Sequence, residues 1–419
     1  IADINLGPAA IKNLMGRINN ELNLIDEIEA DIVAGSSNLS RIVGIADGLQ
    51  VTEDKLSANH HFANVLFNVM RGGLFVDNYT VPRADFIEFV QRFNIDVYAQ
   101  CEAFLNRLDD TFHYSDLIKA AANEDNADLQ RLCYEYLPLS FSRRHGDPSR
   151  PWNKFSINVK QDDGSQLLDF EGNWRDIFQN WEALSFSIPN YIQSMICKFV
   201  NATTADGYNP YRITKSGIDW EKPDPTDPWA NIGYWGDHQI IYLLKFLEFS
   251  NNHHPGTLQD FLSRDLFCYA NVPYRIKPYS ALLDDPHNTI DFDEDLDTLI
   301  EQRVGQVGAD GRLLWNKDNA VYTVNLTEKL LASALCKLSN FVPEGGIWMN
   351  TQRPEWNDAN NALVGFGISM VTLYYTRRFQ QYLLTLFSDA PFSQVSLSVE
   401  VAGLLTSIHT TFAEHQSLL

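Results

Sequence analysis

The chain has 419 residues, of which 45% are hydrophobic and 12% aromatic, so it can bury a large core and is not a disordered protein. Its formal net charge is −22, from 54 acidic and 32 basic residues, and this charge disfavours binding to nucleic acid. No apolar run reaches the roughly 20 residues that span a bilayer, and residues 1–30 show no signal peptide, so we expect a cytoplasmic protein without a membrane partner.

Helical periodicity dominates from the start of the chain. The chain opens on Ile1 rather than Met, which indicates a processed protein or part of a larger chain. Apolar residues recur at steps of three and four over residues 11–28, and the pattern returns at 62–70 and 86–105. We expect residues 1–50 to form a flanking N-terminal helical segment and residues 51–419 to form the main domain.

The remaining chain predicts further helices and very few strands. Residues 155–159 and 166–170 alternate around an Asp163-Gly164 turn, which predicts one small β-hairpin. The later expected helices are 174–184, 188–200, 240–249, 326–338, 368–387 and 395–412. Because helices follow one another without strands between them, we predict an all-α fold. Long loops separate them at 142–154, 206–236, 271–293 and 343–361, and loops of this length usually carry function.

The segment at residues 345–361 is the most informative one for function. It holds Trp348, Glu355, Trp356 and Asp358 among several amide side chains, just before a long apolar helix. Cleavage of a glycosidic bond needs a carboxylic acid that protonates the leaving oxygen, and indole rings stack on sugar faces. This mixture therefore indicates carbohydrate chemistry, although a solvated helix entrance would have similar residues.

A second candidate segment opens the helix expected at 174–184. Arg175 and Asp176 there are suited to binding sugar hydroxyls, with Trp174 stacking on the ring. The structural alternative is that the acid favours the helix dipole and the arginine pairs with a nearby acid.

A third candidate segment precedes the helix expected at 240–249. It contains Trp235, Asp237 and His238, which would suit the rim of a sugar pocket. Asp237 is also well placed as an N-cap, the commoner role for an aspartate at that position.

Positive charge concentrates in one loop of this acidic chain. Arg143, Arg144, His145 and Arg150 lie within 142–153, and such a cluster could hold phosphate or another anion. A solvated or salt-bridged loop is the structural alternative.

No pattern in the chain indicates a metal or a cofactor. The acidic run 291–297 lacks the glycine and the final glutamate of a calcium loop, so we interpret it as an acidic helix start. The five cysteines are far apart in sequence, which argues against a disulfide framework and against a zinc site. Nucleotide-binding glycine motifs are missing as well.

In chain order, three of these segments resemble the catalytic domain of the cellobiose phosphorylase family and its relatives among the (α/α)6-toroid glycosidases. Trp174-Arg175-Asp176 matches a Trp-Arg-Asp helix start, and Gly236-Asp237-His238 partly matches an Asp-Asp segment before an apolar helix. Residues 354–361 match the loop that carries the family's general acid. The order and spacing agree over residues 170–390, whereas residues 1–140 carry no motif that we can place. The resemblance implies an (α/α)6 toroid of the six-hairpin glycosidase type.

The resemblance also implies roles for individual residues. Glu355 stands where the family has its general acid, an aspartate, and Arg175 and Asp176 stand where it binds sugar. The implied function is cleavage of a glycosidic bond in an oligosaccharide, with inversion at the anomeric carbon. In a hydrolase, Asp176, Asp237 or Asp358 would activate water. In a phosphorylase, Arg144 and His145 with their neighbours would hold inorganic phosphate instead. A catalytically silent protein that binds glycans is the third possibility.

Overall fold

The computed structural model describes residues 11–12, 15–16, 18–19, 21–46, 48–140, 166–210, 212–220, 222–226, 239–286, 288–349 and 366–418, with the side chains of residues 21–24, 173, 175 and 239 excluded. The chain divides into two compact units, Ile1–Phe67 and Asn68–Leu419. We describe each unit by itself. The predicted boundary after residue 50 stays a prediction.

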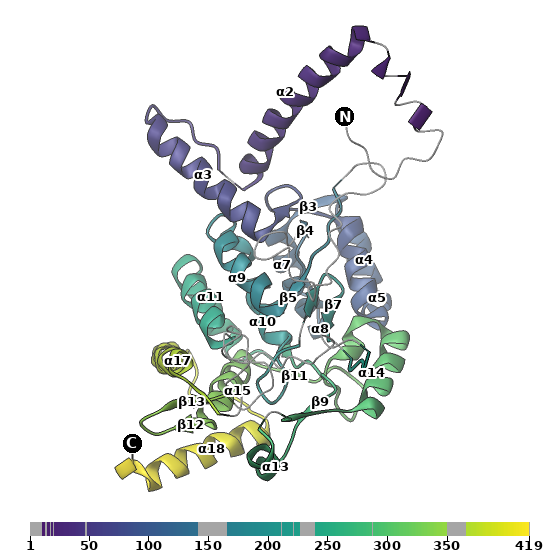
Figure 1. Cartoon of the computed structure of the whole chain (residues 1–419). Coiled ribbons are helices and arrows are strands. Elements are labelled where there is room, and N and C mark those ends of the chain that lie inside the picture. The colour runs from purple at the N-terminus through teal and green to yellow at the C-terminus, as the bar shows by residue number, and fades with distance from the viewer. Residues whose placement is uncertain are drawn as a thin grey trace. The chain divides into compact units, whose positions relative to one another are not determined.

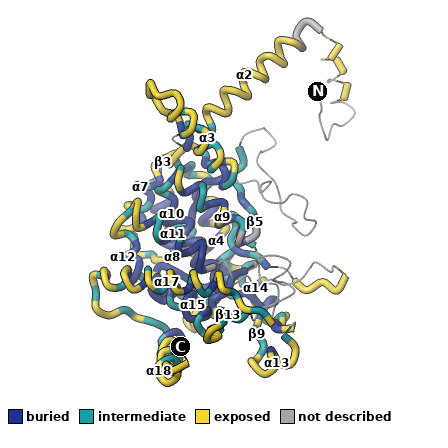
Figure 2. Tube along the Cα trace, turned by 60° about the vertical axis from the view of Figure 1, so that its left-hand side comes forward, coloured by how far each residue is buried: buried dark blue, intermediate teal, exposed yellow. Residues whose placement is uncertain are grey.

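The first unit contains α2 (Glu21–Ile45) and most of α3 (Lys55–Gly72). Asp54 caps α3, since its Oδ1 accepts hydrogen bonds from the backbone N–H groups of Leu56 and Ser57, both at 3.1 Å. The apolar stripe predicted at residues 11–28 reaches into α2, where its members Ile25 and Ile28 are 65% and 46% exposed. Figure 2 shows α2 exposed along most of its length.

The second unit is mostly helical, as the sequence predicts (Figure 1). Its first part holds short helices: α4 (Arg83–Phe93), α5 (Ile95–Gln100), α6 (Glu102–Arg107), α7 (Tyr114–Ala121) and α8 (Ala127–Glu135). The helices that follow are α9 (Trp174–Ser185), α10 (Ile192–Asn201), α11 (Gln239–His253), α12 (Thr257–Phe261), α13 (Tyr279–Asp284), α14 (Glu294–Val307), α15 (Leu326–Leu338), α17 (Met370–Ser388) and α18 (Val399–Glu414). Short 3₁₀ turns are η1 (Pro189–Tyr191), η2 (Ala309–Arg312) and η3 (Gln416–Leu418).

The core of this unit is built around α10, whose residues are all buried. The rings of Trp174 and Phe178 in α9 lie 4.5 Å and 4.8 Å from the ring of Phe199 in α10. Helix α11 covers another side of α10, and the dark blue of these helices in Figure 2 marks the interior. Among the described helices, none combines the length and apolar character needed to cross a bilayer.

Small antiparallel sheets tie the helices together. They pair β1 (Leu74–Phe75) with β4 (Leu139–Ser140), β2 (Thr80–Pro82) with β3 (Thr111–His113), β8 (Phe267–Cys268) with β11 (Thr323–Val324), and β9 (Tyr274–Ile276) with β10 (Ile290–Phe292). Two sheets have three strands: β5 (Glu171–Asn173), β6 (Arg212–Thr214) and β7 (Gly217–Asp219), and β12 (Phe341–Val342), β13 (Gly346–Trp348) and β14 (Ile368–Ser369). The described chain therefore has more strands than the single predicted hairpin.

Several predicted elements need correction. The second strand of that hairpin is not continuous, because residues 167–169 are not in a strand, and its first strand lies outside the described residues. The helix predicted at 86–105 is broken where Asn94 caps α5, accepting hydrogen bonds from the N–H groups of Asp96 and Val97. The long loop predicted at 271–293 contains β9, α13 and β10. The acidic helix start is confirmed, since Asp293 caps α14. The six-hairpin toroid stays a prediction.

Candidate functional site

Most of the predicted site residues lie outside the part of the chain that the structure describes. These are Arg144, His145, Trp235, Asp237, His238, Glu355, Trp356 and Asp358. The backbone of Arg175 lies in the first turn of α9, and its side chain is outside the description as well. The structure therefore places Trp174, Asp176 and Trp348 and the ends of the segments that carry the others.

Trp174 is a core residue in this structure. Its indole is 0% exposed, and its ring lies 5.3 Å from that of Phe178 and 4.5 Å from that of Phe199. This packing leaves no face for a sugar, so we do not carry Trp174 into the proposed site. Asp176 is half-buried on the same turn of α9.

The starts of α9 and α11 lie at the same end of α10. Helix α9 runs antiparallel to α10, because its first residue, Trp174, contacts Phe199 near the end of α10. Helix α11 is also antiparallel to α10. Gln193 at the start of α10 donates a hydrogen bond at 3.2 Å to Ser250, which lies near the end of α11. The described start of α11 and Asp176 in the first turn of α9 therefore lie at the same end of α10.

Strand pairing fixes both ends of the segment that carries Glu355. Trp348, the last residue of β13, is paired with Ile368 of β14, and the N–H of Met349 donates to the carbonyl of Gly367 at 3.1 Å. Trp348 is half-buried, and its ring makes an edge contact with that of Tyr279, with 6.2 Å between the centroids. The described chain on either side of residues 350–365 is thus paired in one small sheet, beside the rings of Trp348 and Tyr279.

A buried ionic cluster lies where α8, α10 and η2 meet. The guanidinium of Arg131, which is 1% exposed, binds Asp310 at 2.5 Å, Glu135 at 3.1 Å and Asp128 at 3.1 Å. Asn201 at the end of α10 donates to Glu135 at 2.6 Å. Paired charges of this kind are the arrangement in which buried ions are tolerated.

Lys198 of α10 lies beside this cluster in an aromatic surround. Its Nζ is 5.5 Å, 5.3 Å and 5.4 Å from the ring centroids of Phe89, Phe93 and Phe170. Burial lowers the pKa of Lys198 from 10.5 to about 8, and Glu135 acts in the opposite direction. Burial also raises the pKa of Asp310 from 3.8 to about 6, although the Arg131 guanidinium opposes this rise.

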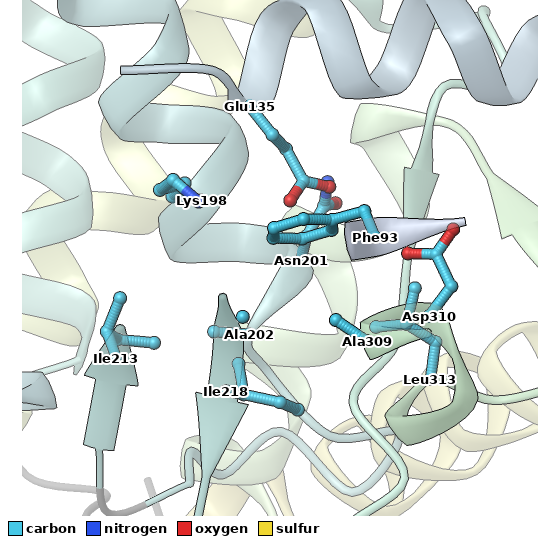
Figure 3. Close-up of a pocket in the computed structure, with 11 residues that line it drawn as sticks. Phe93, Glu135, Lys198, Asn201, Ala202, Ile213, Ile218, Ala309, Asp310 and Leu313 are labelled. Atoms are coloured by element: carbon cyan, nitrogen blue, oxygen red, sulfur yellow. The ribbon is translucent and has the colours of Figure 1, made fainter. Parts of the chain in front are cut away.

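Together these groups border a cavity of about 30 Å³, shown in Figure 3 with Glu135, Lys198, Asn201 and Asp310 around it. Perturbed pKa values often mark active sites, but they also arise in structural ion-pair networks. The volume admits a water molecule or two and excludes a sugar. We therefore interpret the cluster as a structural centre at the end of α10, the end at which α9 and α11 begin.

Sequence reasoning missed the cluster because its members are far apart. Arg131 and Asp310 are separated by 179 positions, and neither belongs to a motif. Lys198 offered a signal, since it interrupts the apolar run from Met195 to Val200 inside a predicted helix. A lysine on an otherwise apolar helix needs partners, and those partners were not visible in the sequence.

Comparison with known families gives one match. A family model described as glycoside hydrolase family 149 insertion domain 1 matches residues 75–138, from β1 to just before β4. No curated protein matches the chain. The matched region includes Arg131 and Glu135, and it lies in the part of the sequence that carried no motif. The matching model is named for an insertion domain of a glycoside hydrolase family, and it covers residues 75–138 of the 419.

Proposed function

We propose that this protein cleaves a glycosidic bond in an oligosaccharide, with inversion at the anomeric carbon and with Glu355 as the general acid. The observation that carries the proposal is the similarity of residues 75–138 to an insertion domain of a glycoside hydrolase family. The three segments that resemble the cellobiose phosphorylase family support the same chemistry and favour an (α/α)6 arrangement of residues 51–419.

The roles follow from what an inverting reaction requires. Glu355 protonates the departing oxygen, and this general acid catalysis contributes about 10²–10⁴-fold to the rate. A second carboxylate, about 6.5–9.5 Å from the acid, activates water. Asp176, Asp237 and Asp358 are the candidates for this base. Arg175, His238 and the indoles of Trp235, Trp348 and Trp356 bind the sugar.

Two features of the described fold favour this arrangement. Asp176 and the described start of α11 lie at the same end of α10. Strand pairing brings the two ends of the Glu355 segment together beside Trp348. All of these elements belong to the second compact unit, Asn68–Leu419.

The test is an assay of product formation on neutral oligosaccharides of two to six units, with and without inorganic phosphate. A hydrolase releases free sugar in both conditions. A phosphorylase releases a sugar 1-phosphate and does so only with phosphate present, in which case Arg144 and His145 become the phosphate ligands to test.

The matched variants are Glu355→Gln and Glu414→Gln, the second at an exposed glutamate at the end of α18. We expect Glu355→Gln to lower kcat by about 10²–10⁴-fold and Glu414→Gln to leave it unchanged. A protein that binds oligosaccharides equally well before and after Glu355→Gln, with no turnover in either form, would instead be a glycan-binding protein.

A further inference from the structure

An open hollow of about 290 Å³ lies among the loop after α10, the C-terminal half of α15 and the first turns of α18. Its buried floor is largely apolar and includes Tyr208, Cys336 and Val401. Its rim carries the polar side chains of Asp206, Asn340 and Glu400. The volume is close to the lower end of the range of about 300–1,000 Å³ found for small-molecule sites, so the hollow suits one small ring.

The rim groups are those that bind hydroxyls. Part of Asp206 is exposed to solvent, but protein surrounds its carboxyl group on most sides. The resulting loss of hydration raises the pKa of this carboxyl group. Its Oδ1 accepts a hydrogen bond from Thr204 Oγ1, which holds the carboxylate in place. The side-chain N–H of Asn340 donates to the carbonyl of Cys336 at 3.0 Å, which fixes the orientation of the amide. Carboxylate and amide oxygens above an apolar floor match the hydroxyl edge and the C–H face of a pyranose.

An aromatic pair adjoins the hollow. Trp348 is joined to the rim directly, because its backbone N–H donates to the carbonyl of Asn340 at 2.8 Å. Tyr279, three residues after the lining residue Ile276, meets the Trp348 ring edge to face at an interplanar angle of 83°. Tyr279 is 66% exposed, so its ring is open to a ligand. An exposed aromatic ring beside a polar-rimmed hollow is a feature that stacks on sugars.

We propose that this hollow is an accessory saccharide subsite, which holds one neutral sugar unit while Tyr279 and Trp348 contact the next unit of the same chain. The proposal rests on the proposed function for its ligand class. It assigns Asp206 and Asn340 to the hydroxyls of the bound unit.

The test compares Asp206→Asn and Tyr279→Ala with the wild type. Tyr374→Ala is the matched control, because this tyrosine is 62% exposed on α17 and does not line the hollow. Binding is measured by calorimetry on series of gluco-, manno-, xylo- and galacto-oligosaccharides of two to six units. Turnover is measured on the shortest oligosaccharide that the wild type cleaves.

We expect each hollow variant to weaken binding of oligosaccharides of three or more units by about tenfold, the loss of one stacking or hydrogen-bonding contact. The control variant should bind like the wild type, and turnover of the shortest substrate should stay within twofold. Unchanged affinity in both hollow variants, or no binding by the wild type to any series, overturns the subsite. If the wild type turns over oligosaccharides and the hollow variants bind as tightly as it does, the subsite is wrong and the proposed function stands. If the hollow variants bind more weakly but the wild type shows no turnover, the proposed enzymatic function is wrong and the subsite stands.

Discussion

Replacing Lys198 by methionine tests whether the charge beside the buried ionic cluster opposes folding. Methionine keeps most of the length and the apolar contacts of lysine with Phe89, Phe93 and Phe170. It removes a positive charge that burial disfavours. We expect Lys198→Met to be more stable than the wild type at neutral pH, although it deletes a cation from an aromatic surround.

The magnitude follows from the pKa of Lys198. A fall from 10.5 to about 8 corresponds to about 3 kcal/mol of unfolding free energy at pH 7, where the lysine is charged in both states. Because the folded pKa is the lower one, the unfolded chain binds more protons between pH 8 and 10.5. The wild type therefore gains stability as pH rises through this window. At pH 10 the penalty falls to about 1 kcal/mol or less.

The assay is urea unfolding of both proteins at several values between pH 7 and pH 10. The difference in unfolding free energy between Lys198→Met and the wild type isolates Lys198, because the other titrating groups are common to both. We expect this difference to shrink by about 2–3 kcal/mol as pH rises from 7 to 10. A difference that stays constant to within about 0.5 kcal/mol would show that Lys198 titrates like a solvated lysine and would refute the reasoning.

Three further changes test the buried centre and the core. Arg131→Met leaves three carboxylates without their shared partner, and we expect a loss of about 3–5 kcal/mol in unfolding free energy; a loss below 1 kcal/mol would contradict it. Gly308 has φ of +104°, and an added Cβ would lie 2.4 Å from the carbonyl oxygen of Arg92, so Gly308→Ala should lower the melting temperature clearly more than Gly256→Ala, where φ is +93° and the space is open. Trp174→Phe should lower stability by about 1–3 kcal/mol and leave oligosaccharide affinity unchanged; a selective loss of affinity would restore Trp174 to the site.

The sequence predicted the long helices well because their apolar periodicity is strong. Residues 326–338 were expected as a helix and form α15, which starts after the Asn325 cap. The short strands were missed, since elements of two or three residues cannot show alternation. The helix predicted at 86–105 was broken by capping at Asn94, a local hydrogen-bonding preference that outweighed periodicity.

The candidate site was predictable only in part. Trp174 lies at a helical spacing from Ile177, Phe178 and Trp181, all of them buried, so the same periodicity that predicted α9 also placed its indole on the core face. The ionic cluster and the hollow depend on tertiary contacts between distant segments, such as Arg131 with Asp310. No local pattern encodes those contacts.

The most direct test of the central claim, that Glu355 supplies a proton to a leaving sugar, varies the leaving group. Fluoride departs with little need for protonation, so a glycosyl fluoride of the substrate sugar does not depend on a general acid. We predict that Glu355→Gln lowers kcat/KM about 10²–10⁴-fold on the natural glycoside and leaves kcat/KM on the glycosyl fluoride within about tenfold of the wild type. Equal losses on both substrates, or no loss on either, would contradict the assignment.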